Sequence, residues 1–143
     1  MINAGLMSSA SAEWATPPEL FERYDNLYNF GLDVCASHAN HKCPQWYHIE
    51  DDGLAQTWKG FGSVWCNPPY GKEIGKWVEK CHNESDGVIV VALLPARTDT
   101  RYFHDHIYNK AKIEFLKGRV KFIRADGKTG PAPFPSMICI WGI

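Results

Sequence analysis

The chain has 143 residues, of which 45% are hydrophobic and 22% are charged, and its formal net charge at pH 7 is -1. From this length we expect a single domain with a sizeable core and no separate recognition domain. The near balance of 15 Lys and Arg against 16 Asp and Glu excludes a protein that binds polyanions through its overall charge, so any nucleic-acid surface must be a local patch. No apolar run reaches the roughly 20 residues that cross a bilayer, and the N-terminus lacks a signal-peptide pattern, so we expect a cytoplasmic protein.

The five cysteines are an odd number, and Cys66, Cys81 and Cys139 lie in apolar segments. This pattern favours reduced core thiols over a disulfide framework. Residues 1–11 are small and polar without periodicity. We therefore predict a flexible N-terminal tail over residues 1–11 and one domain over residues 12–143.

The first half of the chain predicts one helix and three strands. Thr16 is a favoured N-cap residue, and the two prolines after it suit the first turn of a helix over about residues 17–26. Strands follow at residues 32–35 and 45–50. Only twenty-odd residues separate the first strand from the apolar run at 64–66, so a crossover helix does not fit and a further strand is missing there.

Residues 64–71, VWCNPPYG, carry the most specific pattern of the chain. The apolar run looks like a buried strand, and Pro68 and Pro69 end regular structure immediately after Asn67. A stiff elbow at the carboxyl end of a strand, followed by the aromatic ring of Tyr70, suits a flat ligand that carries an amine or amide.

The second half of the chain alternates helical and strand patterns. A single helical turn over residues 54–58 precedes the elbow, and the predicted elements after it are a helix over 72–85, a strand over 88–94, a helix over 100–107 and strands over 112–116, 119–123 and 136–141. We expect the last two strands to pair antiparallel, with residues 124–135 as a loop between them. The predicted fold class is α/β, with a mostly parallel sheet and a C-terminal antiparallel hairpin.

Four segments in order resemble the small Dam-like N6-adenine methyltransferases of bacteriophages. They are EWATPP at 13–18, LDVCAS at 32–37, NPPY at 67–70 and PFPS at 133–136. The resemblance implies a trimmed Rossmann-like class I methyltransferase fold. It also implies that the protein transfers a methyl group from S-adenosylmethionine to the exocyclic N6 of adenine in DNA.

The resemblance also implies a cofactor site. Asp33 is the candidate for the methionine ammonium group, because a charge-assisted hydrogen bond is about twice as strong as a neutral one. Asp51 or Asp52 could receive the ribose hydroxyls or the adenine amino group, although an Asp-Asp-Gly turn at the surface explains them equally well. The cofactor-binding candidates are Trp14, Thr16, Pro17, Asp33, Ala36 and Asp52.

The catalytic candidates are Asn67, Pro68, Pro69 and Tyr70. The amide oxygen of Asn67 and the carbonyl of Pro68 can each accept one hydrogen of the target amine, which favours the tetrahedral geometry that attacks a sulfonium methyl group. Tyr70 would stack on the base and supply roughly 1–3 kcal/mol.

Basic residues gather in the second half of the chain, where we expect phosphate contacts. The DNA-binding candidates are Arg97, Arg101, Arg119, Arg124 and Lys128. The expected partner is duplex or single-stranded DNA with a short or degenerate target sequence, and the protein is expected to be a monomer or a homodimer.

Three alternatives stay open on the sequence alone. The same elbow serves methylation of cytosine N4 and of a protein glutamine. A nucleotide- or zinc-binding module without enzymatic activity is the third, since Cys35, His38, His41 and Cys43 lie within nine positions. Their spacing is too tight to close easily into a tetrahedron, so we predict no metal.

Overall fold

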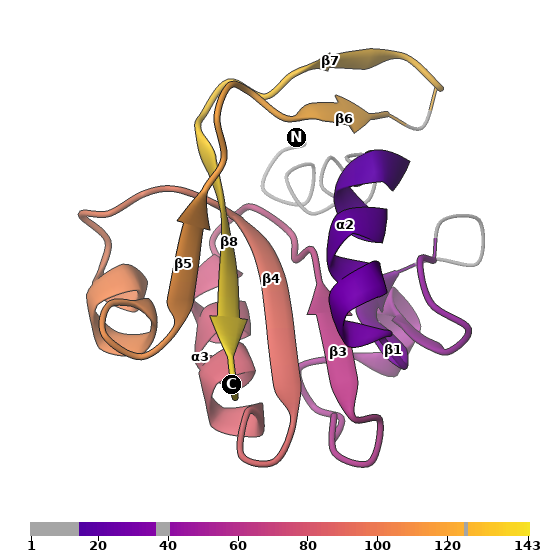
Figure 1. The fold of residues 1–143 in the computed structure, drawn as a ribbon, viewed down its shortest axis with the longest axis vertical. Coiled ribbons are helices and arrows are strands. Elements are labelled where there is room, and N and C mark those ends of the chain that lie inside the picture. Colours follow the sequence, from indigo (N-terminus) through magenta and orange to yellow (C-terminus); the bar gives the residue numbers. More distant parts are fainter. Residues whose placement is uncertain (1–14, 37–40, 125) are drawn as a thin grey trace.

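The computed structural model describes residues 15–36, 41–124 and 126–143. It contains a six-stranded sheet in the order β2-β1-β3-β4-β8-β5 and a separate two-stranded sheet, β6-β7 (Figure 1). The elements are α2 (Pro18–Tyr28), β1 (Leu32–Ala36), β2 (Trp46–His48), the 3-10 helix η1 (Ile49–Asp51), β3 (Ser63–Cys66), α3 (Ile74–Glu84), β4 (Ile89–Pro95), the π-helix η2 (Phe103–Ile107), β5 (Lys112–Phe115), β6 (Lys121–Ile123), β7 (Thr129–Pro131) and β8 (Ser136–Trp141).

The main sheet is mostly parallel, as predicted. Strand β1 runs parallel to both β2 and β3, and β3 runs parallel to β4. Strand β8 is antiparallel to its neighbours β4 and β5. The carboxyl ends of β1 to β4 therefore meet at one edge of the sheet, which is the upper edge in Figure 1.

The predicted pairing of residues 119–123 with residues 136–141 is wrong. Strand β5 pairs with β8, whereas β6 pairs with β7 in a hairpin outside the main sheet. The chain leaves the sheet at Gly118, which has a φ of 77°. Prolines at 131, 133 and 135 lack the N–H groups that would extend the β8 ladder in that direction. The segment predicted as a plain loop therefore contains β7, the second strand of a hairpin.

The helical turn predicted over residues 54–58 is also absent, because these residues form irregular turns. Trp58 is fully buried there. Its backbone N–H donates to Glu84 Oε1 at 2.6 Å and its indole N–H donates to Gly53 O at 2.9 Å. The described residues 49–62 contain no strand, in agreement with the predicted shortening of the sheet.

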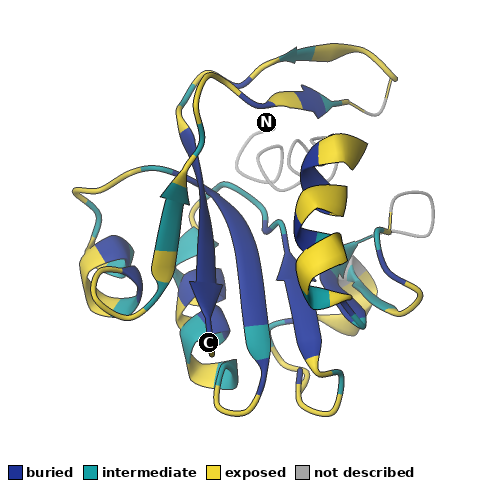
Figure 2. Ribbon diagram, in the orientation of Figure 1, coloured by how far each residue is buried: buried dark blue, intermediate teal, exposed yellow. Residues whose placement is uncertain are grey.

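Two apolar layers cover the two faces of the sheet. Alternate residues of β4 point to opposite faces, so Val90, Ala92 and Leu94 pack toward α3, whereas Val91 and Leu93 pack toward α2. This double burial explains the uninterrupted apolar run of β4. In Figure 2, β3, β4 and β8 are buried almost throughout and α2 exposes its outer face.

All five cysteines are free thiols, and Cys43, Cys66, Cys81 and Cys139 are buried. The prediction of reduced core thiols is thus confirmed. Within the described part of the chain, no helix is both long enough and apolar enough to span a bilayer.

Candidate active site

The elbow lies where the sequence predicts it. Strand β3 ends at Cys66, which pairs with Ala92 of β4, and Asn67 follows at the carboxyl edge of the parallel strands. The residues of β3 are fully buried because helices cover both faces of the sheet. The two prolines cannot continue the strand, so the chain turns away at the sheet edge with Asn67 half-buried.

The side chain of Asn67 is held at both ends. Its Nδ2 donates to Thr16 Oγ1 at 3.2 Å, and its Oδ1 accepts from the Tyr70 hydroxyl at 2.8 Å. The same hydroxyl lies 2.8 Å from Leu93 O, so one proton is shared between two acceptors. Burial raises the pKa of Tyr70 well above its usual value, which keeps this hydroxyl protonated and excludes it as a base.

The ring of Tyr70 contacts two phenylalanines from the hairpin of β6 and β7 and the residues that follow it up to β8. We call this segment the β6-β7 arm. The ring centroid of Phe122, on β6, lies 6.1 Å away at an interplanar angle of 79°. The ring centroid of Phe134, just after β7, lies 5.5 Å away at 78°. Arg97 places its guanidinium 5.7 Å from the Phe134 ring. The arm and the segment after β4 therefore converge on the elbow.

Thr16 does not cap α2 with its side chain, contrary to the prediction. The N-cap residue is Pro17, and no side chain forms a cap hydrogen bond there. Thr16 is only 1% exposed, and its hydroxyl faces Asn67 instead. Its neighbour Ala15 exchanges both backbone hydrogen bonds with Ile123 of β6, at 2.8 and 3.0 Å. Thr16 and the half-buried Pro17 thus lie between β6 and the elbow.

Asp33 is the second residue of β1 and is 3% exposed. Its carboxylate accepts from the backbone N–H groups of Cys35 at 3.3 Å and Lys42 at 3.0 Å. Burial nevertheless raises its pKa to about 7, because desolvation of the charge outweighs these hydrogen bonds. A nearby cation would therefore change the charge of Asp33 at neutral pH. Ala36, the last residue of β1, is half-buried at the same edge.

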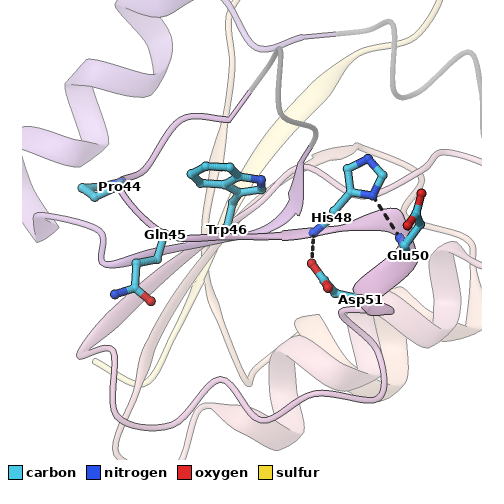
Figure 3. Close-up of a pocket in the computed structure, with 6 residues that line it drawn as sticks. All are labelled: Pro44, Gln45, Trp46, His48, Glu50 and Asp51. Carbon is cyan, nitrogen blue, oxygen red and sulfur yellow. Dashed lines mark hydrogen bonds between the residues drawn. The ribbon is translucent and has the colours of Figure 1, made fainter.

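A cavity of about 410 Å³ lies beside β2 and η1 (Figure 3). Its lining residues are Pro44, Gln45, Trp46, His48, Glu50 and Asp51. Figure 3 shows Glu50 and Asp51 gathered near His48 at the carboxyl end of β2. The carboxylate of Asp51 accepts from the backbone N–H of His48 at 2.7 Å.

The predicted ribose ligand Asp52 is not among these lining residues. It is exposed, with a φ of 53°. Glu50 is thus a cavity carboxylate that the sequence reading missed, because nothing in its local pattern marks it as part of a site.

The basic candidates are exposed side chains in two segments. Arg119, Arg124 and Lys128 belong to the β6-β7 arm and its approach, and Arg97 and Arg101 follow β4. Figure 1 shows the arm above the carboxyl edge of the sheet, so both segments lie on the side of the elbow. Trp14 lies outside the described residues.

Sequence reasoning missed Phe122, Leu93 O and the side-chain contact of Thr16 with Asn67. The alternation of Lys121, Phe122 and Ile123 indicates only a half-buried strand, and no local pattern identifies the partner of a carbonyl group. Phe134 was already part of the PFPS segment, although its contact with Tyr70 was not foreseen.

The cysteine and histidine run near β1 is only partly described, because His38 lies outside the described residues. His41 stacks on Trp46 with ring centroids 3.6 Å apart, and its Nδ1–H donates to Cys43 O, 2.9 Å away. Burial raises the pKa of Cys35 to about 12 and opposes the thiolate form that metals require. Among the described residues, no three His, Cys, Asp or Glu side chains are grouped so as to hold a metal ion.

Comparison with known proteins identifies the family. The sequence model of the DNA N-6-adenine-methyltransferase (Dam) family matches residues 4–142. The DNA N-6-adenine-methyltransferase of Escherichia phage T1 is 29% identical over 138 residues, covering 83% of this chain and 56% of that protein. The enzyme of the same name from Haemophilus phage HP1 is 30% identical over 118 residues, covering 79% of this chain and 67% of that protein. The chain thus spans between about half and two thirds of the length of these relatives. Because the family match covers almost every residue, the chain belongs to the DNA N-6-adenine-methyltransferase (Dam) family.

Proposed function

We propose that this chain is an S-adenosylmethionine-dependent DNA methyltransferase that modifies the N6 of adenine. The observation that carries the proposal is the position of Asn67, whose carboxamide is anchored at the carboxyl edge of a parallel sheet. That edge is where ligands bind in open α/β sheets. Family membership and the names of the two phage relatives support the same reaction.

The proposed fold is a trimmed Rossmann-like class I methyltransferase fold. Three features support it: the parallel strands β2, β1, β3 and β4, the antiparallel β8 inserted between β4 and β5, and helices on both faces. The short connection between β2 and β3 accounts for the missing strand.

The elbow would act on the target amine by accepting its hydrogens. Asn67 Oδ1 and Pro68 O each take one N–H, which turns the nitrogen lone pair away from the ring and toward the methyl donor. Tyr70 can meanwhile donate its proton to Leu93 O, so it does not compete with the amine for Asn67 Oδ1. The surplus proton leaves the methylated nitrogen for water after the transfer, so no dedicated base is required. S-adenosylmethionine, when bound, supplies the electrophilic methyl group.

The residues present fit this cofactor at two neighbouring places. Asp33 offers a buried carboxyl group whose charge a cofactor ammonium would stabilise. Strand β2 is the parallel neighbour of β1, with Ala36 opposite His48, so the cavity at its carboxyl end lies next along the same edge. There the carboxylates of Glu50 and Asp51 suit ribose hydroxyls, and the Trp46 ring suits an adenine. The exposed Asp52 is the alternative ribose ligand.

The β6-β7 arm would bind the DNA. It presents Arg119, Arg124 and Lys128 as exposed cations on an element that also contacts Tyr70 through Phe122. Phosphate contacts by the arm would place the strand near the elbow, and the half-buried Tyr70 ring would stack on the extruded base. We expect the protein to act on this DNA in the cytoplasm.

The test is incubation with labelled S-adenosylmethionine and unmethylated DNA, followed by mass spectrometry of the digested nucleosides. N6-methyladenine is the expected product. Formation of N4-methylcytosine would move the target to the other exocyclic amine, and label found only in protein would indicate a glutamine methyltransferase. The absence of any labelled product with duplex and single-stranded DNA would overturn the proposal.

A further inference from the structure

Thr16 is a buried threonine whose hydroxyl the helix next to it does not use. Helix α2 begins at Pro18, its N-cap is Pro17, and no side chain forms a cap hydrogen bond. At 1% exposure the hydroxyl cannot rely on bulk water either. A buried hydroxyl is costly unless it forms a hydrogen bond, and the contact that the structure provides is Asn67 Nδ2 at 3.2 Å.

The hydrogen bond with Thr16 holds the side-chain amide of Asn67, on which the proposed reaction depends. A carboxamide has one donor end and one acceptor end, and rotation by about 180° exchanges them. When Nδ2 donates to Thr16, Oδ1 is turned toward Tyr70 and remains able to accept from a substrate. Tyr70 fixes this orientation less firmly, because its one proton is shared between Asn67 Oδ1 and Leu93 O, each 2.8 Å away.

Thr16 is itself held in place from the other side. Ala15 is bonded in both directions to Ile123 of β6, and Pro17 restricts the backbone that follows. The hydroxyl therefore reaches Asn67 from a fixed segment rather than from a free loop.

We propose that Thr16 is a positioning residue for the methyl transfer: its hydroxyl accepts from Asn67 Nδ2 and so directs Asn67 Oδ1 toward the target amine. The inference rests on the proposed function. It differs from a cofactor contact, because it acts through Asn67 on the acceptor side of the reaction.

The first test compares Thr16→Val, which keeps the shape and removes the hydroxyl, with Thr16→Ser, which keeps the hydroxyl. We expect Thr16→Val to lower kcat by about tenfold, the value of one hydrogen bond that acts in the transition state, with the Kd of S-adenosylmethionine within about twofold. Thr16→Ser should restore kcat to within about threefold of the wild type. The control Thr57→Val removes an exposed threonine hydroxyl far along the chain and should leave kcat unchanged.

The second test uses Asn67→Asp as a background. A carboxylate presents an oxygen in either orientation, so the orientation of this side chain no longer matters and the loss caused by Thr16→Val should shrink to less than about twofold in this background. An activity-independent readout is the side-chain amide of Asn67 in a ¹H–¹⁵N spectrum, assigned by its absence in Asn67→Asp. Its Nδ2–H signals should shift in Thr16→Val and remain near their wild-type positions in Thr16→Ser.

Several results would overturn the inference. An unchanged kcat and an unchanged Asn67 amide signal in Thr16→Val would show that the hydroxyl does not orient Asn67. A loss of equal size in the wild-type and Asn67→Asp backgrounds, or a Kd for the cofactor that rises as much as kcat falls, would assign Thr16 to the fold or to the cofactor. If the wild type methylates no substrate, it is the proposed function that fails, and the amide signal still tests the contact.

Discussion

Asn67 Oδ1 and Leu93 O compete for the single proton of the Tyr70 hydroxyl, at 2.8 Å from each. The proton can be donated to either acceptor. A target amine that donates to Asn67 Oδ1 would leave the Tyr70 proton to Leu93 O. The proposed binding of an amine at the elbow requires this exchange of donors.

Asn67→Ala removes the side-chain acceptor. We expect methyl transfer to fall by at least about a hundredfold, because the lost interaction acts in the transition state, while cofactor affinity stays within a few fold. Calorimetry with S-adenosylmethionine and a methylation assay measure the two effects. Asn83→Ala, an exposed position on α3, is the matched control. Near-normal transfer by Asn67→Ala would remove the assigned role.

Substitutions at Tyr70 separate the ring from the hydroxyl. Tyr70→Phe keeps the ring against Phe122 and Phe134 and should bind DNA within about threefold of the wild type. Tyr70→Ala should lose about 1–3 kcal/mol of DNA affinity, and Tyr70→Trp less, because stacking requires a π face. Fluorescence anisotropy with labelled DNA measures these affinities. Equal losses for Phe and Ala would show that the hydroxyl rather than the ring holds the base.

At the level of elements, the β6-β7 arm packs against the elbow on one side and presents charged side chains to solvent on the other. Phe122 is buried against Tyr70, whereas Lys121, its neighbour in sequence, is exposed. This follows from the twofold alternation of a strand. An element that contacts both solvent and the elbow can link phosphate binding to the position of the target base.

Replacing Arg124 and Lys128 together with Ala tests the arm as a DNA-binding element. If both contact phosphates, the slope of log affinity against log salt should become shallower by about 1.8 on duplex DNA, from about 0.9 per contact. The control is Lys59→Ala, in the turn that leads to the amino end of β3 and so to the opposite edge of the sheet. A slope that is the same in both variants would mean that these cations do not contact DNA.

For the whole molecule, Asp33 makes stability depend on pH. Its folded-state pKa is raised from the usual 3.8 to about 7 by burial, so between these values the folded state retains a proton that the unfolded state releases. The free energy of unfolding contributed by this group therefore falls as pH rises from about 4 to about 7 and is constant above that. Urea unfolding across this range should show the fall, and Asp33→Asn should flatten it.

The raised pKa of Asp33 also leads us to expect that cofactor affinity depends on pH. An ammonium group beside Asp33 favours the carboxylate, so affinity for S-adenosylmethionine should rise from pH 5 to about 7 and then level off. At pH 8, Asp33→Asn should weaken binding by about 1–2 kcal/mol, or roughly ten- to thirtyfold, and less at pH 6, where Asp33 is largely protonated. Calorimetry at both pH values decides the matter. A flat profile would assign Asp33 to the fold alone.

The sequence by itself determined the position of the elbow and most of the elements. Two prolines end a strand for local steric reasons, so the boundary after Cys66 required no knowledge of the rest of the chain. Three further elements were equally predictable: the helices over 72–85 and 17–26 and the strand over 88–94. The apolar pattern of each segment directly reflects which of its residues face the core. Their observed ends differ by only a few residues.

The tertiary structure alone decided which groups meet at the elbow. The partner of Thr16 lies 51 residues along the chain, and Tyr70 and Leu93 are 23 residues apart. The local sequence predicts that a hydroxyl just before a helix caps that helix. It contains no information about a distant amide, such as that of Asn67, which binds the same hydroxyl instead. The pairing of β6 also depends on the tertiary structure, because its alternation of polar and apolar residues is compatible with several neighbouring strands. The turn at Gly118 and the prolines after β7 direct β6 into its own hairpin with β7.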